Sequence, residues 1–354
     1  MDYINLLKKS QRIVKEKAEL VVSRRIAKKK IKELIQLKGE KVVDKATLKE
    51  IKSYAKERFG SSFYWPWLAL YTEVRGGYKP GWIPYDYFRI ILRKKYNPKS
   101  ASAISHYKSL DHRLVGEFAF KYLLYCISQN FYKGDGTPIN YKAAQDILLS
   151  FDDEVIIKPE CGWKGQGIEF SHSSNVDIRE LSKKRDFLIQ PLCSQCKELK
   201  KINPSSLNTL RFFTYFEPGN MPQMKFSILK FSMGKEKVDN TSAGGGYVRI
   251  HENGQLDEFY YDLYGLKRDR VHPLTGIKFD EIKISSYEEA LTKCKRAHLK
   301  FPYIRFIGWD VSIDEDNKPQ LIEWNGDDPG LWQAEALYGP FWENNFKMRL
   351  RRAD

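Results

Sequence analysis

The chain has 354 residues, of which 42% are hydrophobic and 14% aromatic, so it is long and apolar enough for two to three domains with substantial cores. It carries a net charge of +15, and residues 1–60 hold 18 Lys or Arg against 8 Asp or Glu, so +10 of that excess lies there. No signal-peptide pattern and no run of about 18 uncharged apolar residues occurs, so we expect a cytoplasmic protein, with peripheral binding at the inner membrane face as an alternative.

The cysteines do not form the framework of a secreted protein, because the five are irregularly spaced and odd in number. The one close pair, Cys193 and Cys196, lacks the second pair that a zinc site needs. We therefore expect five free thiols.

Residues 1–60 are expected to form a helical arm. Such a helix can pack on its own protein with its lysines in solvent, or dock on an anionic membrane surface or a protein partner. Nucleic acid is an unlikely partner, because aromatic residues are not interleaved with the basic ones. The prediction rests on apolar residues that recur near a seven-residue spacing: Leu6, Ile13, Leu20, Ala27 and Leu34, beside Leu7, Val14 and Val21.

The following segment is rich in aromatic residues, Gly and Pro, and is expected to pack irregularly. Its cluster of Tyr78, Trp82, Tyr85 and Tyr87 could stack on a sugar, but core packing is the favoured use of such rings. Helical patterns resume at residues 86–95 and 110–129.

A buried strand at residues 155–157 ends in Lys158, and a loop with Gly162, Gly165 and Gly167 follows. Glycines at this spacing let backbone N–H groups approach phosphate oxygens, and a lysine at the strand end supplies charge for the same phosphates. The loop matches neither a Walker A nor a Rossmann sequence. Taken alone, a glycine-rich loop between two strands is more often an ordinary turn.

Two further strands place polar residues at their ends. In LNTLRFFTYF, Asn208, Thr209 and Arg211 crowd one end, where the arginine is either a clamp for phosphate or an oxyanion, or a surface ion pair. The next strand carries Lys230 and is followed by VDNTSAGGG, which leads into another strand.

Residues 306–325 are predicted to form an antiparallel hairpin with its turn centred on Asp316 and Asn317. This turn sets Asp310 directly opposite Glu323, with Asn325 on the same face. Opposed like charges need neutralisation, and two carboxylates with an amide oxygen suit Mg2+. A solvated hairpin with acidic residues on its wet side is the alternative.

Together these motifs resemble the ATP-grasp superfamily, and more closely the sugar-transfer-associated ATP-grasp proteins of polysaccharide gene clusters. The HPLTG motif, at 272–276, and Gln333 are also placed as in that family. The resemblance covers roughly residues 60–345 and is specific for the fold, but much less so for the substrate. The motifs occur in the order VIIKPECGWKGQG, FLIQPL, NTLRFFT, the Lys230 strand, VDNTSAGGG, GWDVSI and LIEWN.

The resemblance implies an ATP site. Lys158 would contact the α- and β-phosphates, the glycine loop would close over the triphosphate, and residues 189–192 would supply the adenine hinge. Cys196 departs from the family pattern, where we expect a histidine. The implied nucleotide-binding residues are Lys158, Gly162, Lys164, Gly165, Gln166, Gly167, Gln190, Pro191 and Leu192.

The resemblance also implies a metal and a reaction centre. Asp310, Glu323 and Asn325 would hold one or two Mg2+ ions, and Arg211 and Lys230 would contact the transferring phosphoryl group. The implied catalytic residues are Arg211, Lys230 and Asn208, and the implied substrate residues are Asn240, Gly245, Gly246, His272 and Gln333.

We therefore expect an α+β protein with the ATP-grasp fold: a helical arm (1–60), a cap and substrate region (61–135), a lid domain (136–198) and a C-terminal antiparallel-sheet domain (199–354). The implied function is ATP-dependent ligation of a carboxylate to an amine through an acyl phosphate, with a uronic acid or related glycan carboxylate as substrate in polysaccharide or capsule biosynthesis. The alternatives are a phosphotransferase acting on a hydroxyl and a non-catalytic binding module that uses the basic arm.

Overall fold

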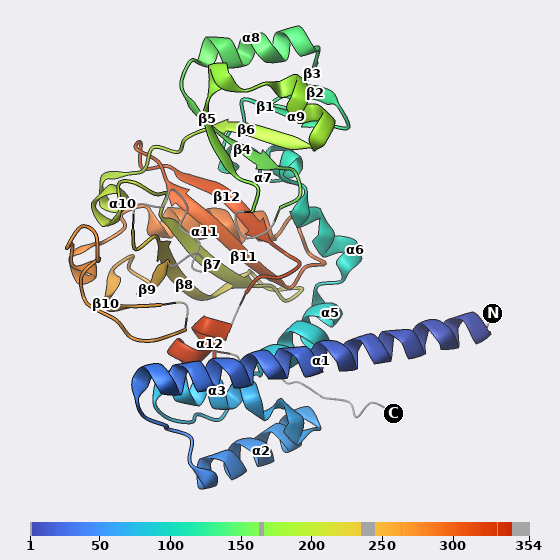
Figure 1. Ribbon diagram of the computed structural model, residues 1–354, viewed down its shortest axis with the longest axis vertical. Helices are drawn as coiled ribbons and strands as arrows, with labels where there is room; N and C mark the ends of the chain where they lie inside the picture. Colours follow the sequence, from blue (N-terminus) through green and yellow to red (C-terminus); the bar gives the residue numbers. More distant parts are fainter. Residues whose placement is uncertain (1, 163–165, 235–244, 263, 331, 342–354) are drawn as a thin grey trace. The chain divides into compact units, whose positions relative to one another are not determined.

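The computed structural model describes residues 2–162, 166–234, 245–262, 264–330 and 332–341 (Figure 1). By their contacts they form two compact units. The helical unit comprises residues 1–98, 264–266 and 330–354, and the two-sheet unit comprises residues 99–263 and 267–329. The division at residue 98 splits the predicted 61–135 region, because its helices up to residue 96 pack with the arm whereas Val115 and Phe118 join the core of a sheet. Within the described part, no helix is long and apolar enough to cross a membrane.

The helical unit contains the predicted arm as two helices. Asp44 caps α2 by accepting a hydrogen bond from the backbone N–H of Thr47 at 2.7 Å, and α2 ends at Gly60, whose φ of 76° favours glycine. The buried Glu73 carboxylate accepts the backbone N–H groups of Val42 and Val43, each at 3.0 Å, and so fixes the connection from α1 to α2. The main helices are α1 (Asp2–Lys38), α2 (Lys45–Phe59), α3 (Trp65–Arg75) and α12 (Trp332–Tyr338).

The predicted apolar stripe of α1 is only partly buried. Ala27 and Leu34 are fully buried, whereas Val14 and Val21 are 67% and 45% exposed. The side chains of Leu6, Leu7 and Ile13 lie outside the described part. The valines fall on the other side of the helix because an α-helix turns by about 100° per residue.

The aromatic segment forms core, as the sequence predicts. Trp82 and Tyr87 are buried, and Trp82 makes edge-on contacts with Tyr71 and Tyr78. The helix predicted at 86–95 is present as α4 (Tyr85–Tyr87), a π-helical turn (Phe88–Leu92) and α5 (Arg93–Tyr96).

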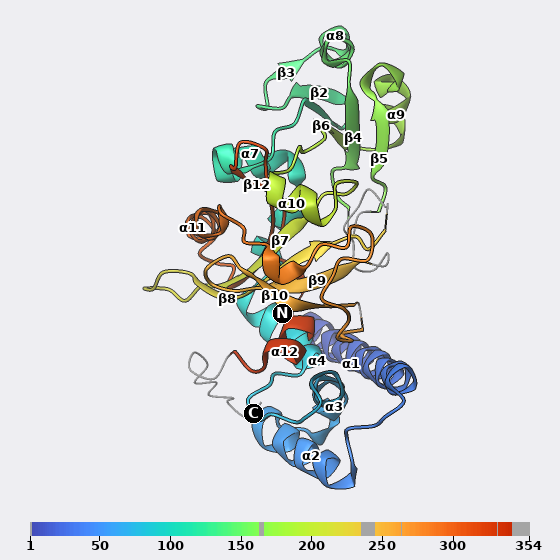
Figure 2. The ribbon, with the colours of Figure 1, turned by 90° about the vertical axis from the view of Figure 1, so that its left-hand side faces the viewer.

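The first sheet of the two-sheet unit is antiparallel, with the order β3-β2-β1-β6-β4-β5. Helices α8 and α9 lie beside it (Figure 2), and Ala144, Leu148 and Ile178 from these helices share its apolar core. Its elements are β1 (Leu124–Ile127), β2 (Asn130–Lys133), β3 (Pro138–Ile139), α8 (Tyr141–Phe151), β4 (Glu154–Pro159), β5 (Glu169–His172), α9 (Ile178–Lys184) and β6 (Phe187–Pro191).

This sheet corrects two predictions. The helix predicted at 110–129 is limited to α7 (Asp111–Val115), because Leu124 and Cys126 are buried in strand β1, which pairs with both β2 and β6. The first sheet therefore begins at Leu124, before the start at residue 136 that was expected for the lid domain. Tertiary pairing of β1 overrides its local helical pattern.

The second sheet is also antiparallel, with the order β10-β9-β8-β7-β11-β12. One face packs on α11 and holds the largest apolar core, including Phe212, Trp309 and Trp324. Its elements are α10 (Lys197–Ile202), β7 (Thr209–Tyr215), β8 (Gln223–Phe231), β9 (Gly246–Ile250), β10 (Leu256–Tyr261), α11 (Tyr287–His298), β11 (Phe306–Ile313) and β12 (Pro319–Asn325).

The predicted hairpin is formed by β11 and β12, and Asp310 lies opposite Glu323 as predicted. The predicted turn, however, is wrong. Ile313 pairs with Pro319, so the turn centres on Asp316 alone. A register shift between Asp310 and Val311 leaves Ile322 without a partner, and this bulge restores the predicted pairing at the acidic residues.

Candidate active site

The face of the second sheet opposite α11 carries charged residues on four neighbouring strands. Arg211 on β7 lies opposite Asp310 on β11, which lies opposite Glu323 on β12. Lys230 on β8 pairs with Thr209, two residues before Arg211, and Asn325 lies two residues beyond Glu323. Alternation along the strands puts these side chains on one side. We call Arg211, Lys230, Asp310, Glu323 and Asn325 the polar face.

Asp310 is the centre of an ion-paired group on this face. Arg211 holds it with two parallel hydrogen bonds, Nε to Oδ1 and Nη2 to Oδ2, both 2.7 Å long. Lys230 Nζ lies 3.1 Å from Oδ1. Burial alone would raise the pKa of Asp310, but the charges of Arg211 and Lys230 outweigh it and lower the pKa to about 2. Asp310 is therefore ionised at neutral pH.

Glu323 and Asn325 are bonded differently from Asp310. Neither side chain makes a hydrogen bond or ion pair with any described residue, whereas the charge of Asp310 is balanced by two cations. In the described part, no three His, Cys, Asp or Glu residues gather as a metal cluster. The donor set on the polar face is one ion-paired carboxylate, one carboxylate with uncommitted oxygens and one amide. Such oxygen atoms fit Mg2+, which takes one or two protein carboxylates beside water and phosphate.

Lys158 lies at the end of β4 in the first sheet, opposite Leu188 on β6. Its side chain is buried, with 8% of the residue exposed, and its ammonium makes no hydrogen bond or ion pair with a described residue. Burial lowers its pKa from 10.5 to about 8, although the negative charge of Glu323 acts in the other direction. Lys158 and the polar face belong to the same unit, and the charge of Glu323 acts on the Lys158 ammonium.

Three residues that the sequence did not single out, Lys108, Ser109 and Glu160, hold the base of the glycine loop. Ser109 donates to the Glu160 carboxylate from its Oγ at 2.7 Å and from its backbone N–H at 3.1 Å. Lys108 Nζ donates to the carbonyl oxygens of Glu160 and Gly162, at 3.4 and 3.3 Å. We call residues 108–111, together with Glu160, the clasp.

Asp111 connects the clasp to strand β12. Its Oδ1 accepts the Trp324 Nε1–H at 2.9 Å, and its Oδ2 accepts the Tyr122 hydroxyl at 3.3 Å. Burial raises the pKa of Asp111 to about 7, against the effect of these hydrogen bonds. Because Trp324 stands between Glu323 and Asn325, Asp111 fixes the backbone that carries both. Lys108 and Ser109 precede the helical pattern predicted at 110–129, and that pattern gave no signal for the contacts of Asp111.

The glycine loop is described only in part. Lys164 and Gly165 lie outside the described residues, and Gln166 is exposed. A Cβ on Gly162 would lie 2.7 Å from Pro159 Cγ, so the close turn after Lys158 requires glycine there. Gly167 has a φ of 73°, and its carbonyl accepts from Arg185 Nη1 at 3.0 Å.

The expected adenine hinge lies at the end of β6. Gln190 is buried and pairs with Ile156 of β4, which lies two residues before Lys158. Pro191 is half-buried and Leu192 is 38% exposed. Cys196 is buried in the core of the second sheet, and all five cysteines are free thiols.

Two of the predicted residues, Asn208 and His272, are buried and make their hydrogen bonds inside the protein. The Asn208 amide nitrogen donates to Gln195 Oε1 at 2.9 Å and to the Leu199 carbonyl at 3.0 Å, and the residue is fully buried. His272 is also fully buried. Its Nε2 donates to the Ser232 carbonyl at 2.9 Å, and its Nδ1 accepts the backbone N–H groups of Leu274 and Thr275. Neither side chain belongs to the polar face.

Two of the remaining predicted residues, Gly245 and Gly246, lie at the start of strand β9. Gly246 is packed so that a Cβ would lie 2.7 Å from the Phe231 ring, and Gly245 beside it is buried. Asn240 lies outside the described residues. Gln333 is half-buried on α12 and belongs to the helical unit.

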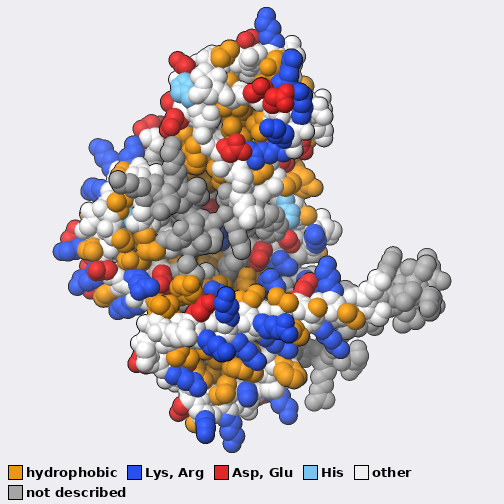
Figure 3. Space-filling view, in the orientation of Figure 1, with side chains coloured by type: hydrophobic (Ala, Val, Ile, Leu, Met, Phe, Trp, Pro, Cys, Tyr) orange, Lys and Arg blue, Asp and Glu red, His pale blue; other side chains and the backbone are white. Residues whose placement is uncertain are grey.

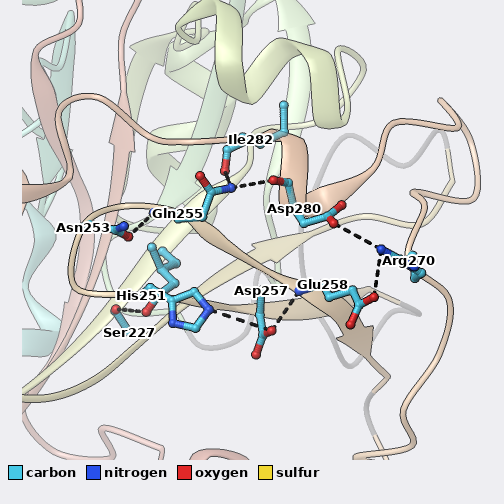
Figure 4. A network of polar contacts seen from close by, with 10 residues as sticks. Ser227, His251, Asn253, Gln255, Asp257, Glu258, Arg270, Asp280 and Ile282 are labelled. Atoms are coloured by element: carbon cyan, nitrogen blue, oxygen red, sulfur yellow. Dashed lines mark hydrogen bonds and ion pairs between the residues drawn. The ribbon is translucent and has the colours of Figure 1, made fainter.

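A separate polar network covers the edge strand β10 (Figure 4). Arg270 bridges Glu258 and Asp280, with Nη2 at 2.8 and 3.3 Å, and Gln255 Nε2 donates to the carbonyl oxygens of Asp280 and Ile282. The Arg270 side chain is 51% exposed. The network ties a loop over the open edge of the sheet, which protects that edge from pairing with other chains.

Comparison with known proteins identifies the chain at the level of a family. The model of the family described as sugar-transfer associated ATP-grasp matches residues 87–344. No curated protein sequence matches the chain significantly.

Solved structures resemble the chain more distantly. The ATP-grasp ligase PsnB, complexed with its minimal precursor, is 13% identical over 69% of this chain and 58% of its own, with a TM-score of 0.37. The D-alanine-D-alanine ligase from Coxiella burnetii is 9% identical over 69% and 56%, with a TM-score of 0.39. The N5-carboxyaminoimidazole synthetase from Staphylococcus aureus, complexed with ADP, is 10% identical over 66% and 47%, with a TM-score of 0.36. The chain spans less than two thirds of the length of each, and likenesses this low do not indicate what it binds.

Proposed function

Because the chain belongs to the sugar-transfer-associated ATP-grasp family, whose model covers residues 87–344, we propose that it is an ATP-dependent ligase that joins a carboxylate to an amine. The observation that carries the proposal is Lys158, a lysine of which only 8% is exposed and which makes no hydrogen bond or ion pair with a described residue. A buried cation is costly unless an anion joins it. A phosphate chain of ATP is the anion that this family uses.

The nucleotide part of the proposal assigns Lys158 to the α- and β-phosphates. The glycine loop, including Lys164, Gly165 and Gln166, would lie over the triphosphate, and residues 190–192 would border the adenine. The clasp supports this assignment, because Ser109 and Lys108 bind the stem of the loop at Glu160 and Gly162.

The metal part assigns Asp310, Glu323 and Asn325 to Mg2+. When bound, the ion would neutralise charge on the β- and γ-phosphates. Arg211 and Lys230 hold Asp310 in its ionised form, and Arg211 also donates from Nη1 to the Pro329 carbonyl at 3.1 Å. We assign to these two cations the further task of attracting the transferring phosphoryl group and the oxyanion that follows.

The reaction proposed proceeds in two transfers. A carboxylate oxygen attacks the γ-phosphorus, the bond from that phosphorus to the β–γ bridging oxygen breaks, and ADP leaves. The amine nitrogen then attacks the acyl carbon, phosphate leaves with one carboxylate oxygen, and the amine proton passes to the departing phosphate. A glycan or small-molecule carboxylate such as a uronic acid is the acceptor that we propose, supported by the sugar-transfer association of the family.

An oxygen-labelling experiment tests the reaction type. Candidate acids carrying heavy oxygen in the carboxylate are incubated with ATP, Mg2+ and candidate amines, and ADP release identifies the active combination. We expect label in inorganic phosphate and an amide product by mass spectrometry. Unlabelled phosphate with a phosphorylated product would instead identify a phosphotransferase, and the absence of ADP release with every pair, together with no ATP binding, would identify a binding module.

A further inference from the structure

The outward side of α1 in the helical unit is basic and partly apolar. The exposed residues Val14, Lys17, Val21, Arg25, Lys28 and Lys32 succeed one another at spacings of three, four, four, three and four, which is one face of a helix. We call these six residues the outer face of α1. It contains no acidic residue.

The acidic residues of the same helix stretch are turned inward or paired. Glu16 and Glu19 both contact Lys94 Nζ, at 3.7 and 3.1 Å, and Lys94 belongs to α5 of the same unit. Glu33 is paired with Lys29 at 3.6 Å. The positive charge of the outer face is therefore not balanced by its own helix.

Two aromatic residues continue this surface toward α2. Trp65 lies beneath two ammonium groups, Lys28 of α1 and Lys52 of α2, at 5.4 and 5.6 Å from its ring. Phe63 is 65% exposed and lies 5.1 Å from the Arg24 guanidinium. Figure 3 shows Lys and Arg gathered over α1 and α2, with hydrophobic side chains between them and few acidic ones.

We propose that the outer face of α1, with Phe63, Trp65 and Lys52, docks on an anionic membrane surface. Val14, Val21 and Phe63 expose 67%, 45% and 65% of their area, and apolar side chains ringed by lysine and arginine suit the boundary between lipid headgroups and acyl chains. Anionic lipids would supply the negative charge that balances the lysine and arginine side chains of this surface. The proposal does not depend on the ligase reaction.

Two other occupants are less well matched. A second copy of the chain would bring a second positive face against the first, and like charges repel. Nucleic acid would neutralise the lysines, but its binding comes from phosphate contacts and leaves exposed valines without a role.

The proposal is tested on the full chain with sedimented vesicles of phosphatidylcholine, alone and with a third of phosphatidylglycerol. We expect binding only to the anionic vesicles, weakening as salt rises. The triple variant Arg25→Glu, Lys28→Glu, Lys32→Glu should bind at least about tenfold more weakly. The double variant Val14→Ser, Val21→Ser should bind several-fold more weakly at unchanged charge.

A matched triple variant controls for net charge. Lys133→Glu, Lys142→Glu and Lys184→Glu change the same number of exposed lysine or arginine charges on the first sheet and its helices, and this variant should bind vesicles nearly as wild type does. Thermal melting verifies that all variants fold. Equal binding to neutral vesicles, equal losses in both triple variants, or binding to duplex DNA without binding to vesicles would overturn the proposal.

Discussion

Two cationic regions of the two-sheet unit differ in how their charge is balanced. On the polar face, Arg211 and Lys230 contact Asp310 at 2.7 and 3.1 Å, so the charges are met within the protein. At the end of β4, Lys158 is more deeply buried than Arg211 and Lys230, and it has no bonded partner among the described residues. The two pKa shifts have opposite meanings. The pKa of Asp310 is lowered to about 2, which favours its charged form, whereas the pKa of Lys158 is lowered to about 8, which disfavours its charged form.

The difference separates a cation that serves the fold from one that serves a ligand. Removing a member of a buried pair leaves its partner uncompensated and is strongly destabilising. Removing a buried cation that has no partner relieves a desolvation cost, so the protein becomes more stable without it. A stability measurement on each region therefore distinguishes the two roles without any knowledge of the substrate.

The largest effect is expected at Glu323, which lies opposite Asp310 but has no bonded partner among the described residues. Glu323→Gln keeps the shape and removes a charge, so the melting temperature should stay the same or rise slightly. ATP turnover at saturating Mg2+ should fall roughly a thousandfold, because a metal ligand supplies several kcal/mol of transition-state stabilisation. Undiminished ADP production would remove Glu323 from the metal site.

Asp310→Asn tests the paired region. The substitution leaves the half-buried Arg211 and Lys230 without this carboxylate, so we expect a loss of about 3 kcal/mol in the free energy of unfolding. Asp262→Asn is the control, because Asp262 is also buried but its partner Arg268 is 44% exposed and stays solvated. Urea unfolding should show a much smaller loss for the control. Similar losses of unfolding free energy in Asp310→Asn and Asp262→Asn would mean that the loss does not depend on how deeply the partner cations are buried.

Lys158→Met should act in the opposite direction. A pKa lowered from 10.5 to about 8 corresponds to a cost of about 3 kcal/mol for holding the charge at neutral pH, and methionine removes it. Without nucleotide, the variant should therefore melt at a higher temperature than wild type, while its affinity for ADP and Mg2+ falls about a hundredfold.

The same substitution in the paired region provides the contrast. Lys230→Met should lower the melting temperature, because Asp310 loses one of its two cations.

The pH dependence of stability gives a second check on Lys158. The unfolded chain holds the Lys158 proton more tightly than the folded one, so wild-type stability should rise between pH 8 and 10.5, and this rise should be absent from Lys158→Met. A lower melting temperature for Lys158→Met would show that the ammonium is satisfied in the free protein.

The sequence predicted the elements whose evidence is local. The hairpin follows from alternation, and Lys158 from a strand that runs into glycines. The correct pairing of Asp310 with Glu323 arose from two differences that cancel, because the turn is shifted and the bulge at Ile322 shifts the register back. Nothing in the sequence indicates that bulge, which lies on the edge strand β12.

Residues that act across long separations could not be predicted in the same way. Ser109 meets Glu160 from 51 positions away, and Asp111 meets Trp324 from 213. Residues 99–118 form only short helical segments, and the helical pattern predicted from residue 110 onward did not indicate these contacts. Asn208 and His272 were assigned by their motifs to the reaction, yet their hydrogen bonds lie within the interior, which only the folded chain shows.

The smallest expected effect concerns the clasp. Ser109→Ala removes the 2.7 Å bond from Oγ to Glu160 while the backbone N–H of Ser109 still donates, so the cost should be about 1 kcal/mol. Because Glu160 leads into the glycine loop, we expect part of that cost in nucleotide affinity, as an approximately threefold rise in the Kd for ADP and Mg2+ by calorimetry. Ser150→Ala is the control, since its hydroxyl bonds only to the Ile147 carbonyl on exposed α8, and ADP affinity should not change there. A Ser109→Ala protein that is less stable but binds ADP with wild-type affinity would show that the clasp only stabilises the fold. A loss of both stability and ADP affinity would show that the stem of the loop is part of the nucleotide site.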